Sequence, residues 1–379
     1  RKGFTVVQIV AGLYPDMPPF DPRGANEAGF PWEREFTRIN PAYFDMADVR
    51  IQYLVDRGIV PCIVGCWGYF LPIMGVPKMK QHWRNLIARW GSYPVVWCLA
   101  GEGAMPYYLS PHREEDTVMQ KKGWTELARY VRGVDALRHP ITIHPSRAAR
   151  DTVEDDSVLD FDMLQTGHND RASIPNTITQ VTRSLGRTPK MPALVGEVCY
   201  EGIMDASRAK VQRFMFWSCI LSGAAGHTYG ANGIWQVNTK EKPYGPSPHG
   251  RSWGDTPWDV AYRLPGSGEL GLAKKLLGRY EWWRFEPHPE WASPHWATDD
   301  YIRAYAAGIP KEVRIFFLPD GNPPVVQALE SGVSYDAYFF NPATGAEHEL
   351  GRVPADASGN WKAPQTPIFQ DWILVLHKG

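Results

Sequence analysis

The feature that most constrains the fold is a series of short apolar runs that alternate with helix-like stretches between Phe4 and Tyr229. Seven runs are predicted to be strands, at residues 4–10, 59–66, 94–100, 139–144, 159–165, 193–198 and 225–229. Most of the stretches between them carry apolar residues at helical spacing, such as the one that begins at Asn40-Pro41 and stops at Gly58. Near-continuous apolar strands alternating with helices indicate a parallel sheet covered by helices.

Two architectures satisfy this alternation, a doubly wound sheet and a (β/α)8 TIM barrel. No Gly-rich phosphate turn follows the first run, as a nucleotide-binding sheet would require. Seven strands at roughly 31 residues per unit leave one strand short of a closed barrel. Because residue 1 already lies at the edge of a strand, we expect a barrel whose first strand lies upstream and is missing from this chain. The gap between residues 144 and 159 is too short for a full helix.

The pattern changes towards the C-terminus. A loop rich in Gly, Pro and Trp covers residues 230–268, and a helix is predicted from about residue 269 to 283. Beyond Pro287, strand-like runs at residues 301–307, 313–318, 335–340 and 368–376 are separated by turn sequences. The prediction is a TIM-barrel domain over residues 1–287 and a small all-β sandwich domain over residues 288–379.

Composition excludes several function classes. Lys+Arg 40 against Asp+Glu 41 gives a net charge of −1, without the positive field that nucleic-acid binding requires. No run approaches the ~18 apolar residues of a membrane span, so neither nucleic acid nor a membrane is an expected partner. The five cysteines lie in apolar segments without Cys-x-x-Cys spacing, which predicts reduced packing thiols. No targeting signal is visible, although processing or truncation would remove one.

Two carboxylates at predicted strand ends are the strongest catalytic candidates. Glu102 directly follows one apolar run and Glu197 lies within another, although glutamate is depleted in strands and rarely buried. They are 197 − 102 = 95 residues apart, three barrel units, so we expect them to face each other across the barrel mouth. Paired carboxylates suit glycoside hydrolysis, and a gap of about 5–5.5 Å suits the retaining mechanism. The alternative for each is an ion pair or a helix cap.

Glu201 is a rival for the nucleophile, and its competing interpretation is a loop carboxylate or a residue at a helix start. Three histidines at strand ends raise the alternative of a metal site. They lack His-x-His or His-x-x-x-His spacing, so hydrogen bonding to sugar hydroxyls is favoured and no metal or cofactor is predicted. The chain also has 16 Trp and 17 Tyr, and aromatic loop residues offer faces on which sugar rings stack. The predicted substrate-binding residues are Trp67, His144, Gln165, His168, Tyr200, Glu201, His227, Tyr229, Asn232 and Trp235.

Five sequence motifs stand out together, at Gly3–Gln8, Asn40–Phe44, Val96–Glu102, Leu164–His168 and the run from Leu221 through Gly230 to Gln236. They resemble motifs of the apiosidase-like glycoside hydrolases, the domain-of-unknown-function 4038 type related to glycoside hydrolase family 140, and the resemblance covers roughly residues 1–290. It implies a barrel glycosidase acting on carbohydrate, with Glu102 as acid/base and Glu197 as nucleophile. Such a polysaccharide-acting enzyme is expected to be secreted or periplasmic. Residues 338–345 are similar to a β-domain called collagen-binding-like.

One position departs from the pattern of large barrel glycosidase clans. These clans have Asn directly before the catalytic acid, whereas this chain has Gly101. The hydrogen bond to the sugar 2-hydroxyl that Asn usually makes must therefore come from another residue. Two alternatives to the glycosidase are a non-catalytic carbohydrate-binding barrel and a metal-dependent TIM-barrel hydrolase.

Overall fold

The computed structural model describes residues 2–379, and contacts between them group the chain into two compact units. The first unit comprises residues 4–165 and 241–255. The second comprises residues 166–240 and 256–379, together with the start of the chain through Gly3. The predicted division at residue 287 stays a prediction.

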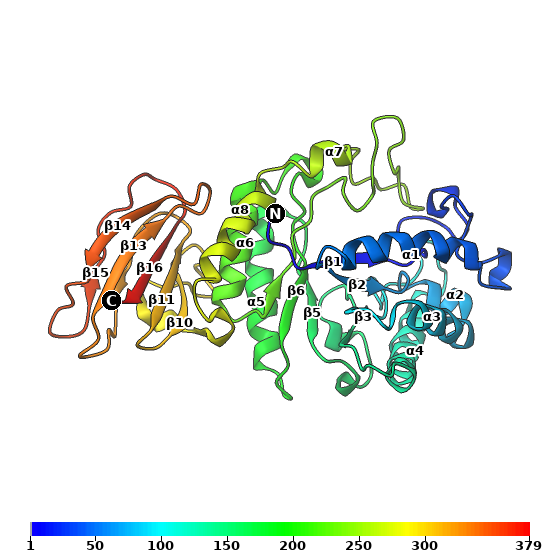
Figure 1. The fold of residues 1–379 in the computed structure, drawn as a ribbon, viewed down its shortest axis with the longest axis horizontal. Coiled ribbons are helices and arrows are strands. Elements are labelled where there is room, and N and C mark those ends of the chain that lie inside the picture. Colours follow the sequence, from blue (N-terminus) through cyan, green and yellow to red (C-terminus); the bar gives the residue numbers. More distant parts are fainter. Residues whose placement is uncertain (1) are drawn as a thin grey trace. The chain divides into compact units, whose positions relative to one another are not determined.

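The first unit contains a four-stranded parallel sheet, seen around β1–β3 in Figure 1. Its strands, in spatial order, are β1 (Val6–Val10), β2 (Val60–Val64), β3 (Val96–Cys98) and β4 (Ile141–Thr142). In this register Val6 lies opposite Val60, and Cys62 lies opposite Val96. The helices of the unit are α1 (Pro41–Val55), α2 (Phe70–Met74), α3 (Val76–Trp90) and α4 (Arg113–Val134). Strand β5 (Asp162–Gln165) is the last element of residues 4–165.

The sequence explains why these helices begin and end where they do. α1 begins at Pro41, and proline is favoured there because the first helical residue needs no backbone N–H. α3 ends before Gly91 and buries Trp83, Leu86 and Trp90, which lie on one face of the helix. Between β4 and β5 only short 3-10 turns form, which confirms that this gap holds no full helix.

The second unit begins with α5 (Ile174–Gly186), β6 (Ala193–Glu197), α6 (Ala209–Leu221) and β7 (Gly226–His227). β6 and β7 pair in parallel, with Leu194 opposite Gly226. The helices α7 (Trp258–Ala261) and α8 (Gly266–Leu277) follow. The boundaries predicted for this helix, residues 269–283, were wrong. The observed helix α8 starts at Gly266 and ends at Leu277, and Trp282–Arg284 form a separate 3-10 turn.

The C-terminal part of the second unit is antiparallel (orange to red in Figure 1). One six-stranded sheet has the order β14 (Glu347–Arg352), β13 (Tyr335–Phe340), β16 (Trp372–Lys378), β11 (Val313–Leu318), β10 (Tyr305–Ile309) and β8 (Glu286–Pro287). A second sheet contains β15 (Trp361–Lys362), β12 (Val325–Val326) and β9 (Ala292–Ser293). Side chains of both sheets, such as Phe316 and Val326, share one apolar core, as in a β-sandwich.

The structure confirms all seven predicted parallel-type strands and the reduced, buried state of the five cysteines. The predicted strand at residues 301–307 was misplaced, because β10 runs from Tyr305 to Ile309. Within residues 2–379 no helix combines the length and the apolar character that crossing a membrane requires.

Candidate active site

Glu102 follows β3 at a tightly packed turn of the first unit. The N–H of Gly68 donates to the carbonyl of Gly101 at 2.7 Å, and the N–H of Gly101 donates to the carbonyl of Cys66 at 2.8 Å. These bonds place the Trp67 ring against Gly101, where an added Cβ would lie 2.1 Å from a ring atom. Gly101 therefore replaces the expected asparagine because the indole already occupies that space. Glu102 itself has φ +41°, a strained left-handed conformation.

Three further predicted residues join Glu102 in this unit. Oε1 of Glu102 accepts a hydrogen bond from Nε2 of Gln165 at 3.2 Å. The N–H of His144 donates to the carbonyl of Ala100, and the carbonyl of His144 accepts from Gly103, both at 2.9 Å. The ring centroids of His144 and Trp67 are 6.3 Å apart. Glu102, Gln165, His144 and Trp67 thus form one cluster at the carboxyl ends of the strands.

Glu197 is the last residue of β6 in the second unit and is 9% exposed. Nε2 of His168 donates to its Oε1 at 2.7 Å. The His168 ring is stacked on Tyr200, with centroids 4.8 Å apart. The N–H of Thr166 donates to the carbonyl of Glu197 at 3.0 Å and fixes the histidine loop beside the strand. Glu197, His168 and Tyr200 therefore form a second cluster.

Glu201, only four residues later, has different partners. It is 1% exposed and accepts from the hydroxyl of Tyr229 at 2.6 Å and from the N–H of Gly266 at 3.0 Å. Gly266 is the first residue of α8, so the carboxylate binds a backbone N–H that the helix leaves unpaired. Burial raises the pKa of Glu201 above its ordinary value. These contacts favour the interpretation of Glu201 as a residue at a helix start. The hydroxyl of Tyr229 is engaged in one of them, as a donor to Glu201.

The remaining predicted residues lie at or after β7. Burial lowers the pKa of His227 to about 3, so its imidazole is neutral at physiological pH. Asn232 is buried, and its Oδ1 accepts from Nε2 of Gln236 at 3.1 Å. Trp235 follows in the same turn. The Asn232 amide thus stabilises the turn that carries the indole.

One polar cluster was missed from the sequence. Asp16, with φ +57°, is buried, and its Oδ1 accepts from the hydroxyl of Tyr108 at 2.9 Å. Tyr244 donates to the carbonyl of Pro15 at 2.6 Å and brings residues 241–255 beside the loop after β1. Burial raises the pKa of Asp16. The paired residues are far apart in the sequence, and no periodicity signals them.

Comparison with known proteins identifies the chain. The family model of the apiosidase-like catalytic domain matches residues 1–284. The chain belongs to the apiosidase-like family. It is therefore a glycosyl hydrolase. None of the curated proteins compared with this apiosidase-like chain matches it.

Solved structures share the fold of the apiosidase-like chain. A glycoside hydrolase has a TM-score of 0.81 at 21% identity, covering 100% of this chain and 86% of its own. A glycoside hydrolase family 5 protein from Bacteroides vulgatus has a TM-score of 0.81 at 20% identity, covering 100% of this chain and 83% of its own. A putative glycoside hydrolase from Bacteroides vulgatus has a TM-score of 0.66 at 14% identity and covers 100% and 73%. At these identities the likeness shows the fold alone.

In the part of the chain that the structure describes, no three His, Cys, Asp or Glu side chains lie close enough together to hold a metal ion.

Proposed function

We propose that the chain is a retaining glycosidase that removes a terminal or side-chain sugar from a polysaccharide. Glu197 is the nucleophile and Glu102 is the general acid/base, and both follow parallel strands of a TIM-barrel type of fold. The observation that carries the proposal is that each carboxylate sits at a strand end and accepts a hydrogen bond from a polar side chain of a nearby loop or strand end. Catalytic groups of barrel enzymes lie at such ends.

The two hydrogen bonds suit different roles. A donor such as the His168 N–H stabilises an ionised carboxylate, which is the form in which Glu197 attacks the anomeric carbon. Gln165 is uncharged and orients Glu102 by donating to its Oε1. We assign to Glu102 the proton that the leaving oxygen receives.

The reaction has two steps. Glu102 protonates the glycosidic oxygen while Glu197 attacks, and the bond between the anomeric carbon and the leaving oxygen breaks as a glycosyl ester forms. Glu102 then removes a proton from water, which attacks the same carbon and releases Glu197. One carboxyl must be protonated while the other is ionised, so the rate is expected to have a bell-shaped pH profile.

Substitution of the carboxylates tests the assignment. On a panel of aryl glycosides, Glu102→Gln is expected to reduce kcat/KM by about 10²–10⁴-fold, the usual contribution of a general acid. Glu197→Gln is expected to reduce it further because no glycosyl ester forms, and Glu201→Gln is the matched control. Proton NMR of the first product should show retained anomeric configuration. An inactive Glu201→Gln beside a fully active Glu197→Gln, or an inverted product, contradicts the proposal.

A further inference from the structure

His168, the hydrogen-bond partner of Glu197, lies on the loop between β5 and α5. This histidine loop comprises residues 166–173. A side chain on a loop keeps one geometry only where the loop itself is held, because a free chain populates many conformations. The N–H of Cys199 donates to the carbonyl of Gly167 at 3.0 Å and fixes the loop just before His168. The part of the loop that follows His168 needs a separate attachment.

The segment after β6, residues 199–207, is a compact turn that α6 holds at both ends. Nε2 of Gln212 donates to the carbonyl of Cys199 at 2.7 Å and to that of Ser207 at 2.9 Å. One amide group, which has two N–H donors, therefore joins the two ends of the turn. Cys199 and Ser207 are both buried. Tyr200, on which the ring of the histidine loop stacks, lies within this turn. The turn is thus a fixed support for the imidazole.

Asp170 joins the histidine loop to this turn on the side that the bond of Gly167 leaves open. Its Oδ1 accepts a hydrogen bond from the N–H of Ser207 at 3.0 Å. Its carbonyl accepts a weaker bond from Sγ of Cys199 at 3.5 Å. A carboxylate acceptor makes a hydrogen bond roughly twice as strong as a neutral one. The segments that carry the two stacked rings are therefore attached to each other on both sides of those rings.

Backbone strain is concentrated at this connection. Asp170 has φ +52° and Ser207 has φ +53°, and within the turn Met204 and Asp205 have φ +48° and +58°. Left-handed conformations are costly for residues that have a Cβ, and they persist only where the surrounding structure imposes them. Such strain gathers at functional sites. Because the hydrogen bond between Asp170 and Ser207 joins two strained residues, the strained backbone and the place of the histidine depend on the same carboxylate.

We propose that Asp170 is a positioning residue of the glycosidase reaction, which holds His168 at hydrogen-bond distance from Glu197. Its carboxylate fastens the histidine loop to the turn after β6, and the loop carries the imidazole to the nucleophile. Reacting groups must be held within about 0.5 Å of their productive geometry by such supporting contacts. The proposal rests on the proposed function, in which Glu197 attacks the anomeric carbon.

Asp170→Ala tests the proposal on an aryl glycoside. It removes the acceptor of Ser207 and should lower kcat/KM about 10- to 100-fold, because displacing a reacting group by about 1 Å costs up to about 100-fold. Asp170→Asn keeps an acceptor oxygen and is expected to restore most of the activity. Asp205→Ala is the matched control, because it places alanine at another left-handed residue and removes a fully exposed carboxylate. Equal kcat/KM in Asp170→Ala and Asp205→Ala overturns the proposal.

Nitrogen-15 NMR of histidine-labelled protein reports the hydrogen bond between His168 and Glu197 without catalysis. The Nε2 signal of His168, assigned by its absence from His168→Gln, should shift in Asp170→Ala. It should stay at its wild-type position in Asp170→Asn and in Asp205→Ala. If Asp170→Ala does not fold, Asp170→Gly removes the same carboxylate without strain, because glycine adopts φ +52° freely, and should shift the signal instead. An unchanged signal in a folded alanine or glycine variant overturns the proposal.

Comparison with Glu197→Gln separates the role of Asp170 from the proposed function. A shifted Nε2 signal in Asp170→Ala together with full activity of Glu197→Gln shows that the nucleophile is wrongly assigned, whereas Asp170 still positions His168. An unshifted signal in Asp170→Ala together with an inactive Glu197→Gln shows the reverse. The nucleophile assignment then stands, and the histidine loop is held by its other bonds.

Discussion

At the scale of single residues, two glutamates four positions apart have different surroundings. Glu197 faces the imidazole of His168, whereas Glu201 is bound by a backbone N–H of α8 and by Tyr229. A histidine partner is compatible with a carboxylate that reacts. A carboxylate that holds a helix start has its oxygens already used, so its main contribution is to stability.

Glu201→Gln is therefore expected to lower the free energy of unfolding by about 1–2 kcal/mol, because the amide satisfies only one of the two donors. The sign of its pH dependence follows from the raised pKa of Glu201. The protonated form is favoured in the folded state, so its stabilising contribution is full below the ordinary pKa of about 4.3 and is lost as pH rises. Urea unfolding between pH 4 and 8 should show the wild type losing its advantage over Glu201→Gln. An advantage that grows with pH contradicts this.

Gly101→Asn tests why glycine precedes Glu102. The new side chain would clash with the Trp67 ring and should cost about 1–3 kcal/mol of stability, as overpacked substitutions do. Thermal unfolding measures the loss. Gly133→Asn is the control, because an added Cβ there meets nothing within 4 Å. The double variant Gly101→Asn with Trp67→Ala removes the clash, so its loss should be smaller than the sum of the two single losses. Strict additivity would show that the two residues do not interact.

The lowered pKa of His227 predicts that the free energy of unfolding decreases in acid. Its pKa is lowered to about 3, so the folded state resists protonation, whereas the unfolded chain binds a proton near pH 6.5. The stabilising contribution is present above pH 6.5 and is lost as pH falls towards 3. His227→Gln should flatten this part of the curve in urea unfolding at successive pH values. His82, whose pKa is lowered to about 4, contributes a similar slope that remains in the variant. Parallel curves for wild type and variant contradict the prediction.

At the scale of helices and strands, burial decided what the sequence could predict. Strands β2–β6 are apolar because they are largely buried, and all seven parallel strands were recognised, although β1 and β7 are only half-buried. β14 was missed because its Glu-His-Glu-Leu-Gly-Arg sequence is largely exposed at a sheet edge and has no apolar pattern. α8 begins at Gly266-Ser267-Gly268, which is typical of a loop, because its first N–H is bound by Glu201. Such a start depends on a residue distant in the sequence.

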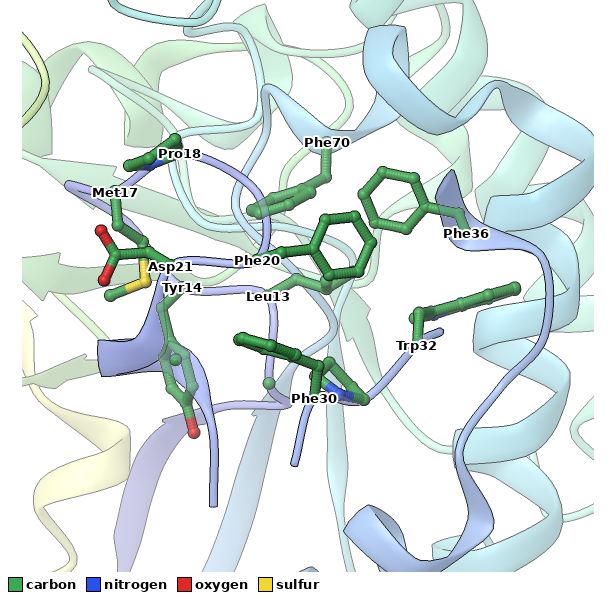
Figure 2. A pocket seen from close by; sticks show the side chains of 13 residues that line it. Leu13, Tyr14, Met17, Pro18, Phe20, Asp21, Phe30, Trp32, Phe36 and Phe70 are labelled. Atoms are coloured by element: carbon green, nitrogen blue, oxygen red, sulfur yellow. The ribbon is translucent and has the colours of Figure 1, made fainter. Parts of the chain in front are cut away.

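The residues of the candidate site also differ in whether the sequence could predict them. Strand ends are local signals, so the positions of Glu102 and Glu197 at strand ends could be predicted from the sequence, and their catalytic roles stay predictions. The Asp16–Tyr108 pair and the group of aromatic rings of the loop between β1 and α1 (Figure 2) depend on how long loops pack, which has no period to detect. The hydrogen-bond partners of Glu201 and Asn232 are likewise set by the tertiary structure. The sequence alone therefore could not show whether these two residues bind substrate or hold other parts of the chain in position.

An ion cluster in the second unit joins α6, α8 and the residue before β16. Arg213 of α6 donates to Asp371 at 2.6 and 2.7 Å and to Glu269 of α8 at 2.5 Å. All three side chains are largely buried. Arg213→Met leaves two buried carboxylates without their cation and should cost about 3–5 kcal/mol in urea unfolding. Arg38→Met, which breaks an exposed pair with Glu33, should cost less than about 1 kcal/mol. Equal effects of the two variants contradict this.

At the scale of the whole molecule, the C-terminal strands belong to the same compact unit as the Glu197 cluster. Phe214 of α6 contacts Tyr305 and Phe317 of the antiparallel sheet, with ring centroids 6.1 and 5.5 Å apart. The sheet therefore covers an apolar face of α6, and Asp371 neutralises Arg213 beside it. We therefore expect the core of the glycosidase part of the second unit to be incomplete without these strands.

A chain that ends at Pro287 tests this dependence. It exposes Phe214 and leaves Arg213 without Asp371, and we expect it to aggregate or to unfold at a lower temperature than the full chain. Soluble yield, binding of a hydrophobic dye and thermal unfolding measure the loss. Phe369→Ala in the full chain, which removes an exposed ring from the deleted part, should leave all three unchanged. If the shortened chain is soluble, melts at the temperature of the full chain and hydrolyses aryl glycosides at the same rate, the sheet is an independent appendage. Residues 2–287 would then form a complete core on their own.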